Sequence, residues 1–236
     1  MTPRTAWRGC AAAGIVAFIC SASFGRIPGM AACGPAGDLG PIIAFEFART
    51  QADIAALFGS EPCTATLVAA QKTGLLLDAL GFIPFYTAFL ILGVIAAGSR
   101  RRVQMAMIAI FMVAAVSDQI EGGILYAILR DPPGTPALLG ALWWAVHVKF
   151  ALLALGTIGI AEILARGRRL SRLFAGFIAM GGLLALTGLM TMPSSWMMTG
   201  FLLGWVSLLI AALIASFSSL FAAHAAPPPG PATPSA

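Results

Sequence analysis

Long apolar runs recur along the chain, and short polar segments separate them. Hydropathy predicts six transmembrane helices, at about 9–25, 73–97, 103–129, 138–165, 170–192 and 196–222. Most of these runs reach the roughly 20 residues that a helix needs to cross about 30 Å of hydrocarbon. The sequence therefore predicts an all-α fold, a polytopic transmembrane helical bundle that takes up residues 1–224 as a single domain.

Composition points to the same class of protein. Of the 236 residues, 59% are hydrophobic and 10% are charged. A soluble domain carries about 25% charged residues, so this chain cannot cover a folded surface with solvated side chains. The basic residues are split among short loops, which argues against nucleic-acid binding. The expected partner is a lipid bilayer, and the sequence identifies no oligomeric state.

The first apolar run has two interpretations. Arg4 and Arg8 precede it and the small residues Ser21 and Ser23 follow it, a pattern that also describes a cleaved secretory signal peptide. A retained first span gives six spans and makes every charged loop agree in orientation, so we favour it. Cleavage would leave the other five spans oriented as before.

Basic residues are divided unequally between the two ends of the predicted spans. One end carries Arg4, Arg8, Arg100, Arg101, Arg102, Arg166, Arg168, Arg169 and Arg172. The other end carries Arg26, Arg49, Lys72 and Arg130, together with Asp38, Glu46, Asp53, Glu61 and Asp131. Lys and Arg in short loops favour the cytoplasmic side, so we predict two cytoplasmic termini and a bacterial inner-membrane location.

The loop at 26–72 is then external, and it contains a candidate disulfide. Cys33 and Cys63 both lie in this loop, whereas Cys10 and Cys20 fall within the first apolar run. An oxidising exterior permits a bridge, so we expect Cys33 and Cys63 to be joined, with two unpaired thiols as the alternative.

The same loop contains helix signals. Thr50 and Asp53 have the spacing of a capping box, and Gly59 is a stop signal. The preceding segment, 42–47, is apolar enough to rest on the membrane or to cap the bundle. We expect the loop to shield helix ends, and a lid over a substrate is the alternative.

Two further patterns concern the last part of the chain. Gly200 and Gly204 form a GxxxG step, which predicts close packing against another helix. The tail at 225–236 contains five prolines among small residues and is predicted to be disordered.

Ionisable residues inside the predicted spans are the main functional signal. They are Asp78, Asp118, Glu121, His147 and Lys149. Each charge near a helix centre costs about 2.5 to 3.5 kcal/mol on insertion scales, so these residues need partners or water. Asp118, Glu121 and Lys149 lie at matching depths, roughly 12 to 16 Å from the outer ends of their spans. We expect Lys149 to pair with Asp118 or Glu121 in a cluster that opens outward past the shallower Asp78.

Helical phase separates His147 from this pairing. His147 and Lys149 are two residues apart, so their side chains point about 200° away from each other. We expect His147 to face another helix or to lie beside Trp143, one turn away.

Two short motifs lie before and within the second span. Glu46, Ala48 and Thr50 form a Glu-x-Ala-x-Thr stretch, and Asp78, Phe82, Ile83, Pro84 and Tyr86 form Asp-x-x-x-Phe-Ile-Pro-x-Tyr. In these motifs the sequence resembles a group of uncharacterised bacterial polytopic membrane proteins. The resemblance implies a multi-pass inner-membrane protein and no particular activity.

Residues for familiar catalytic and metal chemistry are missing from the sequence. The chain has two histidines, His147 in the fourth predicted span and His224 just past the sixth, and it contains no CxxC, GxSxG, HExxH or GxxxxGK[ST] motif. We therefore expect no catalytic residue, no metal ion and no cofactor.

The polar cluster leaves three interpretations of function. The one we favour is an acidic site, countered by Lys149, that passes a small solute or cation and couples its passage to carboxylate protonation. The alternative is a structural or assembly subunit whose buried charges only fix helix packing. The third is an intramembrane enzyme that uses His147 with a carboxylate as acid and base.

Overall fold

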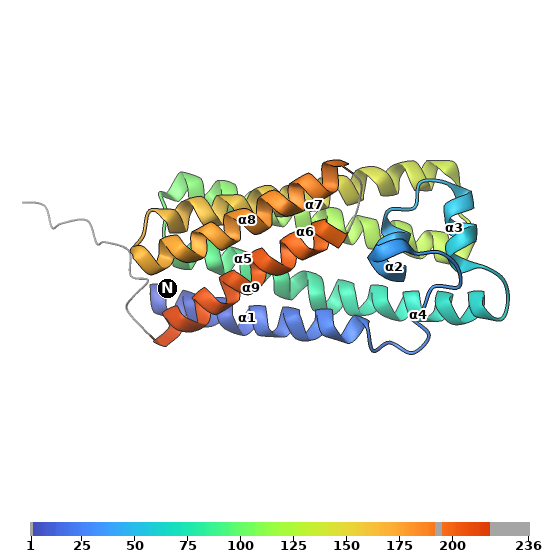
Figure 1. Cartoon of the computed structure of the whole chain (residues 1–236), viewed down its shortest axis with the longest axis horizontal. Helices are drawn as coiled ribbons and strands as arrows, with labels where there is room; N and C mark the ends of the chain where they lie inside the picture. The colour runs from blue at the N-terminus through green and yellow to red at the C-terminus, as the bar shows by residue number, and fades with distance from the viewer. Residues whose placement is uncertain (1, 192–194, 218–236) are drawn as a thin grey trace, which may run out of the picture.

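The computed structural model describes residues 2–191 and 195–217, and the regular elements of these residues are all helical (Figure 1). Among the described residues, six helices are long and apolar enough to cross a membrane. They are α1 (Pro3–Phe24), the rod formed by α4 (Cys63–Leu77), η2 (Asp78–Phe82) and α5 (Ile83–Ala97), α6 (Arg101–Arg130), α7 (Pro136–Ala165), α8 (Arg169–Thr191) and α9 (Ser195–Phe217). The chain is an all-α, multi-pass membrane protein, as predicted.

The helices extend beyond the predicted spans. The first begins at Pro3 instead of residue 9, and the second rod begins at Cys63 instead of residue 73. Hydropathy misses these turns because they are more polar than the membrane-crossing part of the same helix. The predicted end of the last span at 222 and the predicted disordered tail at 225–236 lie outside the described residues.

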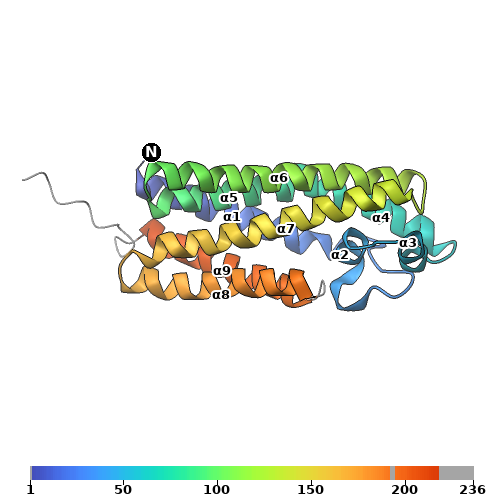
Figure 2. The same ribbon diagram turned by 90° about the horizontal axis from the view of Figure 1, so that it is seen from above.

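The two hairpins of the bundle differ in length. The helices α6 and α7 have 30 residues each and are about 45 Å long, whereas α8 and α9 have 23 residues each and are about 35 Å long. Both hairpins start at the end of the bundle where the N-terminus lies, so α6 and α7 project past α8 and α9 at the opposite end (Figure 2). We call this opposite end the loop end.

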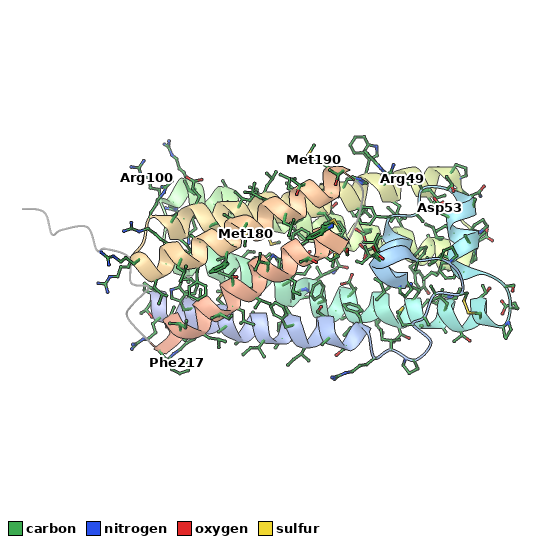
Figure 3. The ribbon with its side chains drawn as sticks, viewed as in Figure 1. Arg49, Asp53, Arg100, Met180, Met190 and Phe217 are labelled. Atoms are coloured by element: carbon green, nitrogen blue, oxygen red, sulfur yellow. A yellow bond between two sulfur atoms is a disulfide. The ribbon has the colours of Figure 1, made fainter. Side chains whose placement is uncertain are left out.

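Three short helices of the 26–62 segment occupy the space that the shorter hairpin leaves at the loop end. They are η1 (Gly37–Leu39), α2 (Gly40–Glu46) and α3 (Gln51–Phe58), and α2 and α3 lie beside the projecting part of α6 and α7 (Figures 1 and 2). Side chains mark the same polarity: Arg49 and Asp53 lie at the loop end, and Arg100 lies at the other (Figure 3). Arg49 and Arg100, which the sequence assigned to different ends, therefore lie at opposite ends of the bundle.

Local bonds hold this segment in place. Cys33 and Cys63 form the expected disulfide, which ties the segment to the first residue of α4. The capping box of α3 is also present: Thr50 accepts from the backbone N–H of Asp53 at 3.1 Å, and Asp53 accepts from the backbone N–H of Thr50 at 2.8 Å. The backbone N–H of Arg49 also donates to Asp53, and this bond is the main cause of the lowered pKa of that carboxyl.

Glycines let α8 and α9 approach at backbone distance. A Cβ placed on Gly181 would collide with the backbone of Gly200 and Gly204, and one placed on Gly200 would collide with that of Ala185. The GxxxG step of the last span therefore packs within this chain, as small residues do at close helix crossings in membranes.

Candidate functional site

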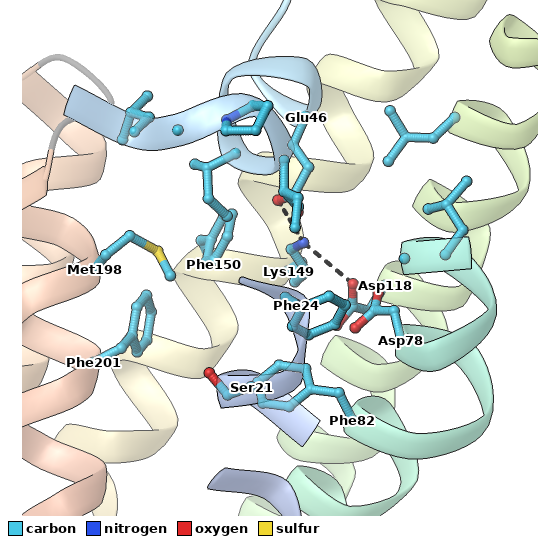
Figure 4. A pocket seen from close by; sticks show the side chains of 18 of the residues that line it. Ser21, Phe24, Glu46, Asp78, Phe82, Asp118, Lys149, Phe150, Met198 and Phe201 are labelled. Carbon is cyan, nitrogen blue, oxygen red and sulfur yellow. Dashed lines mark hydrogen bonds and ion pairs between the residues drawn. The ribbon is translucent and has the colours of Figure 1, made fainter. Parts of the chain in front are cut away.

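Lys149 is the centre of the polar cluster. It lies on α7 with 4% of its surface exposed. Its Nζ lies 3.2 Å from Asp118 Oδ1 and 2.8 Å from Glu121 Oε2, so the expected ion pairs with the neighbouring helix α6 are both present. A third carboxylate, Glu46 Oε2, lies 3.0 Å from the same ammonium (Figure 4). One cation is thus shared by three acids.

Glu46 is the site residue that the sequence analysis missed. It is the last residue of α2, and it points from the loop end down onto Lys149 (Figure 4). Neighbouring Phe45 is fully buried against the ring of Phe58, with the ring centroids 5.1 Å apart, and this contact anchors α2 on α3. The loop therefore does more than shield helix ends: it supplies a carboxylate to the cluster. Burial raises the pKa of Glu46, and the nearby Lys149 only partly opposes this effect.

The other two acids on Lys149 differ in how completely they are bonded. Asp118 also accepts a hydrogen bond of 2.8 Å from the Tyr86 hydroxyl of α5. Glu121 Oε1 accepts a hydrogen bond of 2.8 Å from Lys149, whereas Glu121 Oε2, close to the same ammonium, lacks a donor in hydrogen-bonding geometry among the described residues. The cluster therefore holds more acceptor oxygen than its one ammonium and one hydroxyl satisfy.

Asp78 enters the site from a π-helical turn. In η2 the backbone N–H of Ile83 donates to the carbonyl of Asp78, five residues earlier. Continuing that register would require an N–H from Pro84, which proline lacks, and the carbonyl of Ala79 instead accepts a 3.0 Å bond from Gln119 of α6. Such single π turns are frequent at functional sites.

The Asp78 side chain points toward Asp118 and Lys149 (Figure 4). It lies in the wall of a cavity and is half-buried. Within residues 2–191 and 195–217 its carboxylate has no hydrogen-bond or ion-pair partner. Asp78 is therefore an acid of this cluster that is open to a ligand.

The cavity has a volume of about 340 Å³. Its polar wall is made of Glu46, Gln71, Asp78, Tyr86, Asp118 and Lys149, and its aromatic wall is made of Phe24, Phe82, Phe150, Phe201 and Trp205. This combination of a largely apolar lining with a few converging polar groups is typical of small-molecule sites.

The cavity lies slightly nearer the loop end of α7 than its other end. Lys149 is about 20 Å along α7 from Pro136 and about 24 Å from Ala165. Because α7 projects past the shorter hairpin, part of that distance extends beyond the start of α9 (Figure 2). Met198, in the first turn of α9, lines the same cavity, which places the site level with the start of that helix.

His147 does not join the other four predicted cluster residues. Its ring stacks on Trp143 with the centroids 4.2 Å apart, and its Nδ1 lies 2.7 Å from the Trp143 carbonyl oxygen. Its other ring neighbour is Phe47, at 5.7 Å. The imidazole is absent from the cavity lining, so the geometry gives no acid and base pair between His147 and a carboxylate.

The described residues contain no group of three or more His, Cys, Asp or Glu side chains arranged to hold a metal ion. No protein-family model matches the chain, and the comparisons with curated proteins and with solved structures give no match either. Glu46, Asp78 and Tyr86, which belong to the two motifs noted in the sequence, all line the cavity.

Proposed function

We propose that this protein is an inner-membrane carrier that binds a small solute in the cavity between α2, η2, α6, α7 and α9, and couples its passage to protonation of the cavity carboxylates. In this proposal the loop end faces the outside of a bacterial cell, because the basic residues gather at the other end.

One observation carries the proposal: three carboxylic acids contact a single ammonium beside a cavity, and a fourth acid, Asp78, lines the same cavity. With every group ionised, Glu46, Asp78, Asp118 and Glu121 carry four negative charges against the one positive charge of Lys149. Unbalanced charge in a low-dielectric site is costly, so the cluster is expected to hold protons, a cation or water. In this proposal a solute that enters the cavity displaces one of these protons, and its passage is coupled to proton movement in this way.

A packing role is the second candidate, and a specific contact favours it. The Lys149 ammonium joins α2 to α6, and Asp118 extends the network to Tyr86 on α5. A network that spans four elements fixes helix positions whether or not a solute binds.

Proton movement distinguishes the two roles. The full chain would be reconstituted in liposomes with a pH-sensitive dye inside, and amines, amino acids, sugars and alkali cations would be added outside in turn. A carrier gives a solute-dependent pH change that Asp118→Asn combined with Lys149→Met abolishes while the protein stays folded. If no class of solute moves protons through the folded wild type, the carrier proposal fails and the packing role remains.

A further inference from the structure

We infer that the cavity recognises an organic cation, an ammonium group carried on an apolar body about the size of one aromatic ring. This inference rests on the proposed function, because it names the class of solute for the same site. Two features of the cavity support it: the carboxylate of Asp78, which no described residue pairs, and the aromatic wall.

The cluster has more negative charge than Lys149 can neutralise. Lys149 already contacts three carboxylates, so it has little to offer an anionic ligand, which would also meet the repulsion of the surrounding acids. Asp78 lines the cavity with a carboxylate that no described residue pairs, so an incoming ammonium has a partner there. An ammonium bound to Asp78 also reduces the excess negative charge next to Asp118 (Figure 4).

Aromatic rings in mutual contact also line the cavity, and the ring of Tyr86, whose hydroxyl is bonded to Asp118, is one of them. Tyr86 lies 5.2 Å from Phe82 and 5.5 Å from Trp205, and Phe201 lies 5.7 Å from both Trp205 and Phe150, measured between ring centroids. The indole N–H of Trp205 is already donated to Thr157, at 3.2 Å. What this wall offers a ligand is therefore apolar surface and ring faces, both of which favour an organic cation.

One ammonium already uses this wall. Lys149 Nζ lies 4.3 Å from the centroid of the Phe150 ring, within the range of a cation–π contact. Phe82 and Tyr86 line the same cavity as Asp78, so a ligand ammonium at Asp78 has further aromatic rings available in that cavity. A small hydrated metal ion would gain nothing from these rings, whereas an amine with a ring-sized body would bury its apolar part against them.

Three probes of nearly equal shape and different charge test the inference: 2-phenylethylamine, 2-phenylethanol and 3-phenylpropionate. Each would be titrated calorimetrically at pH 7 into the full chain in detergent. We expect the amine to bind at least about tenfold more tightly than the alcohol, and the carboxylate to bind more weakly than either, because a charge-assisted hydrogen bond is worth more than a neutral one.

Two variants localise the effect. Asp78→Asn keeps the shape of the side chain and removes its charge, and it should weaken amine binding by about tenfold while leaving alcohol binding unchanged. Asp131→Asn removes an equivalent charge from the exposed α6–α7 turn and should change neither. Equal binding of amine and alcohol, equal amine binding in wild type and Asp78→Asn, or no binding of any probe overturns the inference.

These outcomes are separable from failure of the proposed function. If a solute drives proton movement but the chain shows no preference for the amine, the carrier proposal stands and only the organic-cation inference is excluded. The amine could come from the aqueous phase or from a lipid headgroup, and a competition experiment distinguishes the two sources. If phosphatidylethanolamine displaces 2-phenylethylamine and phosphatidylglycerol does not, the source is a lipid. If neither lipid displaces the amine, the source is a soluble molecule.

Discussion

Replacing Lys149 with methionine removes the ammonium that three carboxylates share. Its Nζ lies 3.0 Å from Glu46, 3.2 Å from Asp118 and 2.8 Å from Glu121, and the side chain is 5% exposed, so its removal leaves three buried carboxylates without their shared countercharge. Methionine has a similar length and restores the packing but none of the charge. Breaking a buried ion pair costs about 3 to 5 kcal/mol, and we expect Lys149→Met to lower the free energy of unfolding by this amount.

The cost should be asymmetric between the partners. Glu121→Gln leaves Lys149 with two carboxylates and retains an acceptor oxygen, so its expected cost is about 1 kcal/mol. The double variant Lys149→Met with Glu121→Gln strands one acid fewer than Lys149→Met alone and should recover part of the loss. Lys72→Met, on half-buried Lys72 of α4, is the matched control and should stay within about 0.5 kcal/mol of wild type.

Thermal and denaturant unfolding of the purified chain in detergent, followed by circular dichroism, measures wild type and the four variants under one condition. If Lys149→Met were as stable as wild type, the three contacts of Lys149 would contribute no net energy to folding. A double variant no more stable than Lys149→Met would show that the charge imbalance is not the cause of the loss. Either result refutes the reasoning.

Three further predictions concern the surroundings of the site. Cys33→Ser with Cys63→Ser should destabilise the loop-end segment by roughly 3 to 4 kcal/mol, from the 30-residue separation of the two cysteines, and limited proteolysis of that segment measures it. Gly181→Val should cost about 2 kcal/mol of unfolding free energy by forcing α8 from α9, whereas Gly176→Val, with open space around it, should be nearly neutral; equal effects would contradict this packing. Asp53→Ala should cost about 1 kcal/mol at pH 7 through loss of the α3 capping box. Because the pKa of Asp53 is lowered in the folded protein, this stabilisation is present above the ordinary aspartate pKa and disappears as the pH falls through the lowered pKa. A stability difference between Asp53→Ala and wild type that persists in strong acid would count against this explanation.

The spans and the central ion pairs were accessible from the sequence because they depend on local information. Hydropathy locates a membrane-crossing helix, and counting residues along two antiparallel helices gives the relative depth of Lys149 and Asp118. Helical phase also placed His147 correctly, beside Trp143 and away from Lys149.

Glu46 and the position of the cavity at the start of α9 were not accessible in the same way. Both depend on how α2 folds back onto the bundle and on the length difference between two hairpins, which are tertiary properties. A signal for Glu46 did exist: it is an isolated acid within the apolar segment 42–47. An acid in such a segment needs a buried partner, and Lys149 is the residue that supplies one.

The short α8–α9 hairpin has a consequence for how quickly the site can exchange its contents. Because that hairpin stops early, the cavity is roofed by α2, a separate segment held by the Glu46 ion pair and the buried ring of Phe45, and the spanning helices need not close over it. We expect such a covering segment to open by local unfolding, because the free energy of local unfolding is smaller than the free energy of unfolding the whole bundle. For the solute proposed above, the residence time would then depend on a few contacts of α2, and we expect single substitutions there to change it while the membrane-crossing helices stay as they are.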